Sequence, residues 1–349
     1  MMWQKHLIPQ ETTIKTALGQ LDELAQDALL FIVDAENRLI GSITDGDIRR
    51  GLMKGILIEE NVLVVANLNP KFLRQHSEEF LTQLIKFREN NFKIVPIVSD
   101  DKKLIDCINF RLKKTILPIE CVIMAGGKGE RLRPLTETIP KPLLPVGDIP
   151  IIEHNLNLLF NYGIKKTYIS VNYLSEKIIE FTQKKENSDF SIEIIKEDFP
   201  MGTIGSISLI EDFDSNIVLI SNSDLLTNVD LEQFFMDFKQ SNADLSIVTI
   251  PYTINVPYAV LEVKDHQILD FKEKPSYTYY SNGGMYLVKK EILNHIPKNQ
   301  CFYATDLMEY LIKNNLSVRS FPHHGYWLDI GKHEDYLRAN EDIKSIKLF

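Results

Sequence analysis

The chain is poor in cysteine and tryptophan, and it has no long uninterrupted hydrophobic run. Its 349 residues include three cysteines and two tryptophans. Cys107, Cys121 and Cys301 are odd in number and lie in or beside apolar runs. This usage is typical of reduced structural cysteines rather than of a disulfide framework. We therefore expect free thiols in a cytosolic protein.

Signals for membranes and nucleic acids are also missing. No apolar stretch approaches the ~20 residues that a bilayer-spanning helix needs, and residues 1–11 lack the apolar centre of a secretory signal. The formal net charge of -9 excludes the broad basic field with which nucleic-acid binders attract phosphate backbones. We expect a cytoplasmic protein without membrane or nucleic-acid partners, in which any phosphate-binding cations act locally.

A glycine-rich loop with neighbouring cations is the most informative segment. The apolar run 121–124 predicts a buried strand, and Ala125-Gly126-Gly127-Lys128-Gly129 follows it directly. Glycines there let backbone N–H groups crowd around an anion. Lys128, Arg131 and Lys141 lie close by in sequence and could grip a polyphosphate. The loop lacks the Gly-Lys-Ser/Thr of a P-loop and the spacing of a dinucleotide fingerprint.

This segment resembles the signature of sugar-1-phosphate nucleotidylyltransferases, roughly G-G-x-G-x-R-L-x-P-L-T followed by P-K-P. Residues 126–136 and 140–142 fill every defining position. The resemblance implies that Arg131, Lys141 and a later lysine, Lys274, are catalytic. It also implies nucleotide-binding residues in two segments: Ala125, Gly126, Gly127, Lys128, Gly129, Gly202 and Thr203.

Two acids in matching contexts complete the predicted phosphate site. The apolar run 217–221 predicts a strand, after which comes Asn222-Ser-Asp224, and Asp329 lies in Trp-Leu-Asp-Ile-Gly near the end of the chain. Mg²⁺ prefers one or two carboxylates together with phosphate oxygens and water. In the family that the chain resembles, acids in these two contexts share the metal, so we expect Asp224 and Asp329 to hold Mg²⁺.

The sugar side of the site is predicted from weaker matches. Phe271-Lys-Glu273-Lys274-Pro275 is similar to the family's E-K-P motif, whose lysine binds the sugar phosphate. Residues 281–286 resemble its sugar-contacting N-x-G turn, and residues 200–206 resemble its L-G-T-A-G segment. The expected sugar-phosphate residues are Asn172, Glu273, Lys274, Asn282 and Gly283.

The first ~115 residues contain an internal repeat. Residues 31–43 read as strand, acidic turn, strand, and residues 96–108 repeat that pattern, each after an amphipathic helix. This arrangement resembles a tandem pair of CBS domains. Thr44 and Asp47 match the positions that contact a nucleotide in that family, although they could instead cap the helix that follows. We expect an adenine-nucleotide effector there, or a dimerisation platform without a ligand.

Alternating strands and helices from residue 120 onward predict an α/β fold, with a mainly parallel Rossmann-like sheet and helices on both faces. A smaller α+β CBS-pair domain precedes it. The expected domains are 1–115, regulatory or dimerising, and 118–349, catalytic. We also expect a homo-oligomer.

The implied reaction joins a nucleoside triphosphate and a sugar 1-phosphate, giving an NDP-sugar and pyrophosphate. The combined architecture resembles bacterial enzymes of surface-polysaccharide or nonulosonic-acid pathways, which favours GTP with glucosamine 1-phosphate or a related hexose phosphate. A nucleotide-sugar-dependent glycosyltransferase and a non-catalytic nucleotide sensor are the alternatives. The glycosyltransferase would need an Asp-x-Asp motif where this chain has Asn222-Ser-Asp224.

Overall fold

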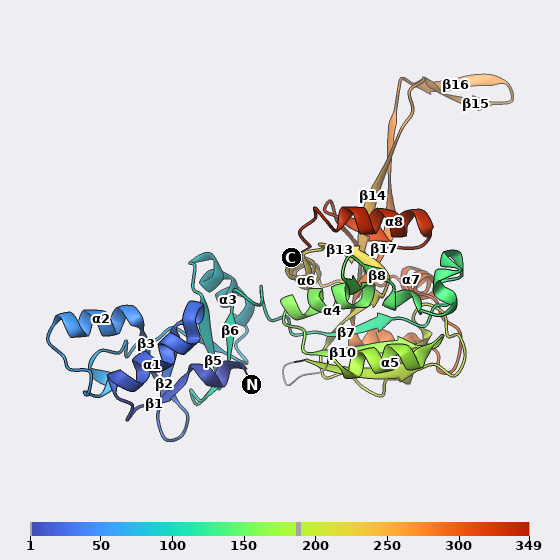
Figure 1. The fold of residues 1–349 in the computed structure, drawn as a ribbon. Helices are drawn as coiled ribbons and strands as arrows, with labels where there is room; N and C mark the ends of the chain where they lie inside the picture. The colour runs from blue at the N-terminus through green and yellow to red at the C-terminus, as the bar shows by residue number, and fades with distance from the viewer. Residues whose placement is uncertain (1, 186–189, 349) are drawn as a thin grey trace. The chain divides into compact units, whose positions relative to one another are not determined.

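The computed structural model describes residues 2–185 and 190–348. The chain divides into two compact units (Figure 1). The first comprises Met1–Leu117 with Asn161–Gly163, and the second comprises Pro118–Phe160 with Ile164–Phe349. Each unit has its own buried clusters and is described separately below.

The first unit contains the same three-stranded sheet twice. In one copy β1 (Leu7–Pro9) runs parallel to β2 (Leu29–Val33), which pairs antiparallel with β3 (Leu39–Thr44). In the other copy β4 (Leu73–Arg74), β5 (Ile94–Val98) and β6 (Leu104–Asn109) repeat these directions. Each copy also has a register shift near the end of its middle strand, at Ile32/Val33 and Ile97/Val98. The repeat predicted from the sequence is therefore confirmed.

Two helices of the first unit begin at a threonine whose side chain caps the helix. Helix α1 (Ile14–Leu24) starts after Thr13, whose hydroxyl accepts a hydrogen bond from the backbone N–H of Thr16. Helix α2 is Asp45–Met53 and α3 is Phe80–Glu89. An ion pair joins the two copies, since the Arg111 guanidinium donates to both carboxylate oxygens of Asp27, at 3.1 and 2.7 Å. This contact holds the pKa of Asp27 below its usual range.

A seven-stranded sheet organises the second unit, in the order β11-β10-β7-β12-β17-β14-β18. All its strands run in one direction except β17, which is antiparallel to both neighbours. The bounds are β7 Glu120–Met124, β10 Lys166–Val171, β11 Ser191–Lys196, β12 Ile217–Asn222, β14 Leu245–Asn255, β17 Ser276–Lys289 and β18 Val318–Pro322. The predicted mainly parallel α/β fold is confirmed.

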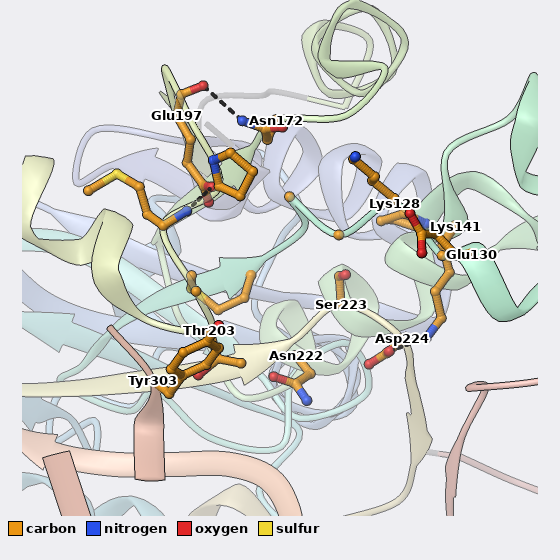
Figure 2. Close-up of a pocket in the computed structure, with 18 of the residues that line it drawn as sticks. Lys128, Glu130, Lys141, Asn172, Glu197, Thr203, Asn222, Ser223, Asp224 and Tyr303 are labelled. Atoms are coloured by element: carbon orange, nitrogen blue, oxygen red, sulfur yellow. Dashed lines mark hydrogen bonds and ion pairs between the residues drawn. The ribbon is translucent and has the colours of Figure 1, made fainter. Parts of the chain in front are cut away.

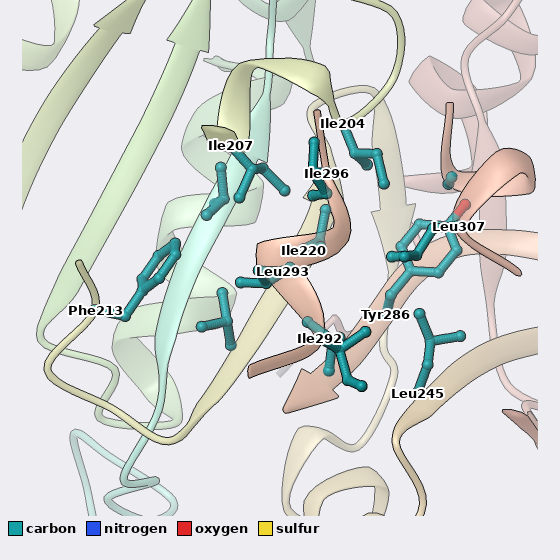
Figure 3. Packing of buried hydrophobic residues seen from close by; sticks show 14 of the residues in the cluster. Ile204, Ile207, Phe213, Ile220, Leu245, Tyr286, Ile292, Leu293, Ile296 and Leu307 are labelled. Atoms are coloured by element: carbon teal, nitrogen blue, oxygen red, sulfur yellow. The ribbon is translucent and has the colours of Figure 1, made fainter. Parts of the chain in front are cut away.

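The central strands of the sheet are continuous apolar runs, as expected for strands that are buried on both faces. Every residue of β12 from Ile217 to Ser221 is buried. Side chains of β12 and β17 pack with Phe213, Ile292 and Leu307 in one large cluster (Figure 3). The helices of this unit are α4 Ile151–Asn161, α5 Ser175–Gln183, α6 Leu231–Ser241, α7 Ala304–Lys313 and α8 His333–Asp342. No helix in the described parts of the chain is long and apolar enough to cross a membrane.

Strands β14 and β17 extend beyond the sheet as a two-stranded ribbon (Figure 1). They pair without interruption from Thr249↔Asn282 to Asn255↔Ser276. A hairpin follows at the far end, formed by β15 (Val260–Lys264) and β16 (Gln267–Lys272). We call residues 250–281 the arm.

Candidate functional site

Topology places a cleft at one edge of the sheet. From β7 the chain continues to β10 and β11 on one side, while β12 lies on the other side. Ligands in such sheets bind at the carboxyl ends of the strands, where the strand order reverses. A cleft of about 670 Å³ opens there (Figure 2). Its lining includes six of the seven predicted nucleotide-binding residues: Gly126, Gly127, Lys128, Gly129, Gly202 and Thr203. It also includes Arg131 and Lys141, predicted as catalytic, Asn172 of the sugar-phosphate set and the predicted metal ligand Asp224.

The backbone geometry requires glycine at two of the three glycine positions of the loop. A Cβ on Gly126 would lie 2.9 Å from the Glu197 carboxylate, so the backbone must approach that side chain closely. Gly129 has φ +62°, which favours glycine. Gly127 has nothing within 4 Å of its Cβ direction, and it is exposed. Ala125 is buried behind the loop, so it fixes the loop rather than lining the cleft.

The two predicted metal-binding acids converge although they are far apart in sequence. Short strands β13 (Leu225–Thr227) and β19 (Trp327–Asp329) pair antiparallel, with Leu225 opposite Asp329. The Ile330 backbone N–H donates to the Asp224 carbonyl at 3.1 Å. Lys141 donates a hydrogen bond to the Asp224 carboxylate, and its Nζ lies 3.8 Å from Asp329 Oδ1. One lysine therefore bridges both acids beside the glycine loop.

This carboxylate pair has the properties of a cation site. Burial, with the neighbouring negative charge of Asp224, raises the pKa of Asp329 to about 6, while Lys141 opposes the shift. Asp224 Oδ1 and Asp329 Oδ1 are buried without a hydrogen-bond partner. Two unsatisfied acid oxygens that repel each other fit a divalent cation. No cluster of three or more His, Cys, Asp or Glu in the described residues could hold a metal, so other ligands would have to come from phosphates and water.

Glu197 was missed by the sequence analysis. It follows β11 directly, is 7% exposed and lines the cleft. Its carboxylate accepts hydrogen bonds from the Ser170 hydroxyl at 2.6 Å and the Met201 backbone N–H at 3.2 Å. Asn172 donates to the Glu197 backbone carbonyl at 3.1 Å (Figure 2). An acid at the end of a strand is the same signal that identified Asp224, so it could have been found.

The segment 200–206 forms the opposite wall of the cleft. Gly202 has φ +80°, and a Cβ there would lie 2.5 Å from the Phe302 carbonyl oxygen. The Thr203 hydroxyl accepts a hydrogen bond from the backbone N–H of Ala304 at 2.8 Å. Tyr303 is exposed on the same wall. Both predicted residues of this segment, Gly202 and Thr203, therefore face the cleft.

Four of the five predicted sugar-phosphate residues lie outside the cleft lining: Glu273, Lys274, Asn282 and Gly283. Glu273 and Lys274 are exposed at the far end of the ribbon, beyond Ser276. Asn282 donates to the Tyr286 hydroxyl at 2.8 Å on its own strand. Gly283 is buried, and its carbonyl accepts a hydrogen bond from the Trp327 indole at 2.9 Å. The described structure thus brings the glycine loop close to Asp224 and Asp329, but it does not bring these four predicted sugar-phosphate residues to the cleft.

Thr44 and Asp47 of the first unit form a reciprocal cap. The Asp47 backbone N–H donates to the Thr44 hydroxyl oxygen, and the Thr44 N–H donates to the Asp47 carboxylate. Arg50 also pairs with Asp47. The two residues therefore cap α2 as the simpler interpretation has it, and their contact with a nucleotide stays a prediction.

Comparisons with known proteins agree with this division. Residues 120–346 match the nucleotidyl transferase family, and residues 2–54 match the CBS domain family. Mannose-1-phosphate guanyltransferase of Schizosaccharomyces pombe is 30% identical over 228 residues, covering 63% of this chain and 62% of that protein. UTP–glucose-1-phosphate uridylyltransferase of Synechocystis is 28% identical over 256 residues, covering 66% of each. The matched region is thus just under two thirds of these relatives' length.

Solved structures show the same catalytic fold. HddC from Yersinia pseudotuberculosis superposes with a TM-score of 0.51 at 25% identity, covering 64% of this chain and 99% of that one. The same protein complexed with GMP-PN gives a TM-score of 0.50. Its family match spans residues 120–346, and its glycine loop, cations and Asp224 line one cleft, with Asp329 joined to Asp224 through Lys141. The chain belongs to the nucleotidyl transferase family.

Proposed function

We propose that this protein is a sugar-1-phosphate nucleotidylyltransferase, which joins a nucleoside triphosphate to a sugar 1-phosphate and releases pyrophosphate. The observation that carries the proposal is the convergence of Asp224 and Asp329 on Lys141 beside the glycine loop. Those residues come from three distant parts of the chain. Phosphoryl chemistry needs cations and carboxylate-held metal at one place.

The cleft supplies the groups that the reaction requires. Backbone N–H groups around Gly127 and the side chains of Lys128 and Arg131 are placed to bind the triphosphate and to stabilise the leaving pyrophosphate. Lys141 neutralises charge near the α-phosphate. The attacking oxygen belongs to a phosphate that is already ionised at neutral pH, so no protein nucleophile is needed. The protein thus acts by positioning and by electrostatics.

Asp224 and Asp329 would hold a divalent cation, and we propose Mg²⁺. When bound, the ion would neutralise charge on the triphosphate oxygens. The fit rests on the two buried carboxylate oxygens, Asp224 Oδ1 and Asp329 Oδ1, which accept no hydrogen bond. Oxygen ligands of this kind suit Mg²⁺ better than softer metals.

Guanine is the base that we favour. Mannose-1-phosphate guanyltransferases are among the relatives, and HddC, a structural neighbour, has been solved in complex with GMP-PN. Uridylyltransferase relatives make UTP the main competitor. For the sugar we propose glucosamine 1-phosphate or a related hexose phosphate, used for surface-polysaccharide or nonulosonic-acid synthesis in the cytoplasm.

An assay that crosses substrates tests this function. Purified full chain with MgCl₂ is incubated with GTP, UTP, dTTP or CTP and the 1-phosphates of glucosamine, N-acetylglucosamine, mannose or glucose. We expect pyrophosphate release that requires both substrates, greatest with GTP. A glycosyltransferase or a nucleotide sensor would release no pyrophosphate. Absence of release for every pair, in a folded protein with metal, would contradict the proposal.

Gly127→Ala should weaken triphosphate binding without unfolding the protein. Its Cβ would meet nothing in the described structure, so the thermal midpoint should change little. The added methyl would occupy space that we assign to phosphate oxygens, so KM for the triphosphate should rise about tenfold, near 1.4 kcal/mol. Steady-state kinetics and thermal melting measure the two effects.

Gly55→Ala is the control for Gly127→Ala, because a Cβ added at the exposed Gly55 would also have no atom within 4 Å. Its φ of +88° makes Gly55→Ala a strained substitution in the first unit. That variant should lose stability but keep the KM of the wild type. Equal KM values for Gly127→Ala and the wild type would contradict the assignment of the triphosphate to the loop at Gly127.

A further inference from the structure

The arm has an apolar face that the described chain leaves exposed. Cross-strand partners share a face, so Tyr252 and Tyr279, with Ile254 beside them, lie together on the ribbon. Their exposed fractions are 62%, 59% and 43%. The opposite face carries Thr253 and Thr278, joined by a hydrogen bond of 3.0 Å, and also Tyr280, which pairs with Pro251 and is 57% exposed.

The hairpin at the end of the arm also has apolar pairs on one face and a polar pair on the other. Leu261 pairs with Phe271 and Val263 pairs with Ile268 on one face, while Glu262 pairs with Asp270 on the other. The four apolar side chains are between 49% and 64% exposed. A register shift between Glu262 and Val263 leaves Leu269, which is 58% exposed, outside these pairs. The alternation of the other pairs is typical of strands with one covered face, and a two-stranded ribbon alone is marginally stable in water.

Together, the apolar face of the ribbon and that of the hairpin match the size of a protein interface. Their seven large members are Tyr252, Ile254, Leu261, Val263, Ile268, Phe271 and Tyr279. At roughly 100 Å² exposed for each, which is about half of a large side chain, they present about 700 Å². A standard interface buries about 800 Å² for each partner. A second copy with the same arm therefore offers enough area for a stable dimer.

Continuous pairing keeps the end of the arm away from its own cleft. At its base, a Cβ on Gly284 would lie 2.7 Å from the cleft residue Asn222. The uninterrupted ladder from Thr249↔Asn282 to Asn255↔Ser276 then carries the chain outward. At about 3.3 Å per residue, six steps cover about 20 Å, and Lys274 lies beyond them. Contact with its own cleft would require breaking the ladder.

The cleft lacks a cation where the sugar phosphate is expected. Its lysines and arginine, Lys128, Arg131 and Lys141, all belong to the segment that follows β7. Among described residues, the wall with Asn172, Thr203 and Tyr303 adds no Lys or Arg to the lining, and Glu197 contributes a carboxylate instead. A sugar 1-phosphate entering along that wall needs further positive charge.

We propose that the apolar face of the arm docks on a second copy of this chain and delivers Lys274 to the sugar-phosphate end of that copy's cleft. The inference rests on the proposed function. In a two-fold dimer the exchange is reciprocal, so each arm completes the other cleft. Lys274 has a left-handed backbone with φ 43° in the turn before β17, which holds it at the end of the ribbon.

Mixing two inactive variants tests whether the lysine acts on the other copy. Lys274→Ala removes the arm's cation, and Asp224→Asn disables the cleft; each alone should retain under about 1% of wild-type turnover. Unfolded together and refolded as a mixture, half of the dimers are mixed and each has one complete site. About a quarter of wild-type turnover should return. No recovery, in a mixture shown by tandem tags to contain mixed dimers, would overturn the proposal.

A control mixture of Asp224→Asn with Arg131→Ala should stay inactive, because both changes damage the cleft. Recovery there would mean that the gain is not due to the arm and would also overturn the inference.

Sedimentation equilibrium tests the docking without using activity. The double variant Ile268→Ser with Phe271→Ser should weaken self-association of the full chain at least tenfold. The matched double variant Glu262→Ser with Asp270→Ser changes the polar face of the same hairpin and should associate like wild type. A wild type that is monomeric at assay concentrations, or apolar-face variants that associate as tightly as wild type, would overturn the proposal. If no substrate pair releases pyrophosphate, the proposed function fails while this measurement still decides the docking.

Discussion

Asp224→Asn should lower turnover by about a thousandfold, equivalent to about 4 kcal/mol of transition-state stabilisation. Asp224 accepts the hydrogen bond of Lys141 and lies beside Asp329, so its charge both orients the lysine and contributes half of the proposed metal site. Asparagine keeps the shape but removes that charge. Pyrophosphate release at saturating substrates and MgCl₂ measures the loss.

The same variant should change the pH dependence of stability in EDTA. Folding raises the pKa of Asp329 to about 6, first through burial and then through Asp224, whereas the unfolded value is near 4. The folded state therefore binds more protons in this range, so the free energy of unfolding falls as pH rises from about 4 to 6. Without the charge of Asp224 that fall should be smaller.

Glu211→Gln provides the control, because Glu211 is an exposed acid outside the cleft lining. It should leave both turnover and the pH dependence unchanged. Asp224→Asn with more than a tenth of wild-type turnover, in a protein that melts like wild type, would contradict the assignment of Asp224.

Arg131→Ala should lower kcat/KM for the triphosphate by about a hundredfold or more. Arg131 lines the cleft, and a Cβ on Gly331 would lie 3.2 Å from its guanidinium, which places it close to Asp329. The planar guanidinium can donate two parallel hydrogen bonds to a phosphate. Arg131→Lys should recover only part of the loss, because an ammonium is a point charge.

The neighbouring Arg133 makes a strict comparison. It is exposed and lies outside the cleft lining, so Arg133→Ala should keep nearly all activity while making the same change in net charge. Equal losses for both variants would show that general charge, rather than a phosphate contact at Arg131, governs the reaction.

Local pattern was enough to predict that the glycine loop and the cations after it lie together at the end of a strand. Strand Glu120–Met124 and the following glycines lie together in sequence, so their arrangement follows from strand and loop preferences. Asp224 was identified as an acid that ends a strand, and Glu197 shows the same signal. Asp329 was placed by resemblance alone. Its approach to Asp224 depends on the pairing of β13 with β19, which no local pattern encodes.

The position of Lys274 could not be predicted in this way. Its E-K-P context is clear in sequence, but the direction of the ribbon depends on how far β14 and β17 continue to pair beyond the sheet. That length is a tertiary property. Similarly, Thr44 and Asp47 matched a ligand pattern and a capping pattern equally well. The hydrogen bonds between them show the cap, and their contact with a nucleotide stays a prediction.

The hydrogen bond from the Trp327 indole to the Gly283 carbonyl gives the molecule a built-in optical reporter. Only one other tryptophan, Trp3, is present in the chain. In a Trp3→Phe background, fluorescence would come from a single indole on the strand that ends in Asp329, hydrogen-bonded to the base of the ribbon. Emission and quenching would then follow substrate entry in real time without an attached label.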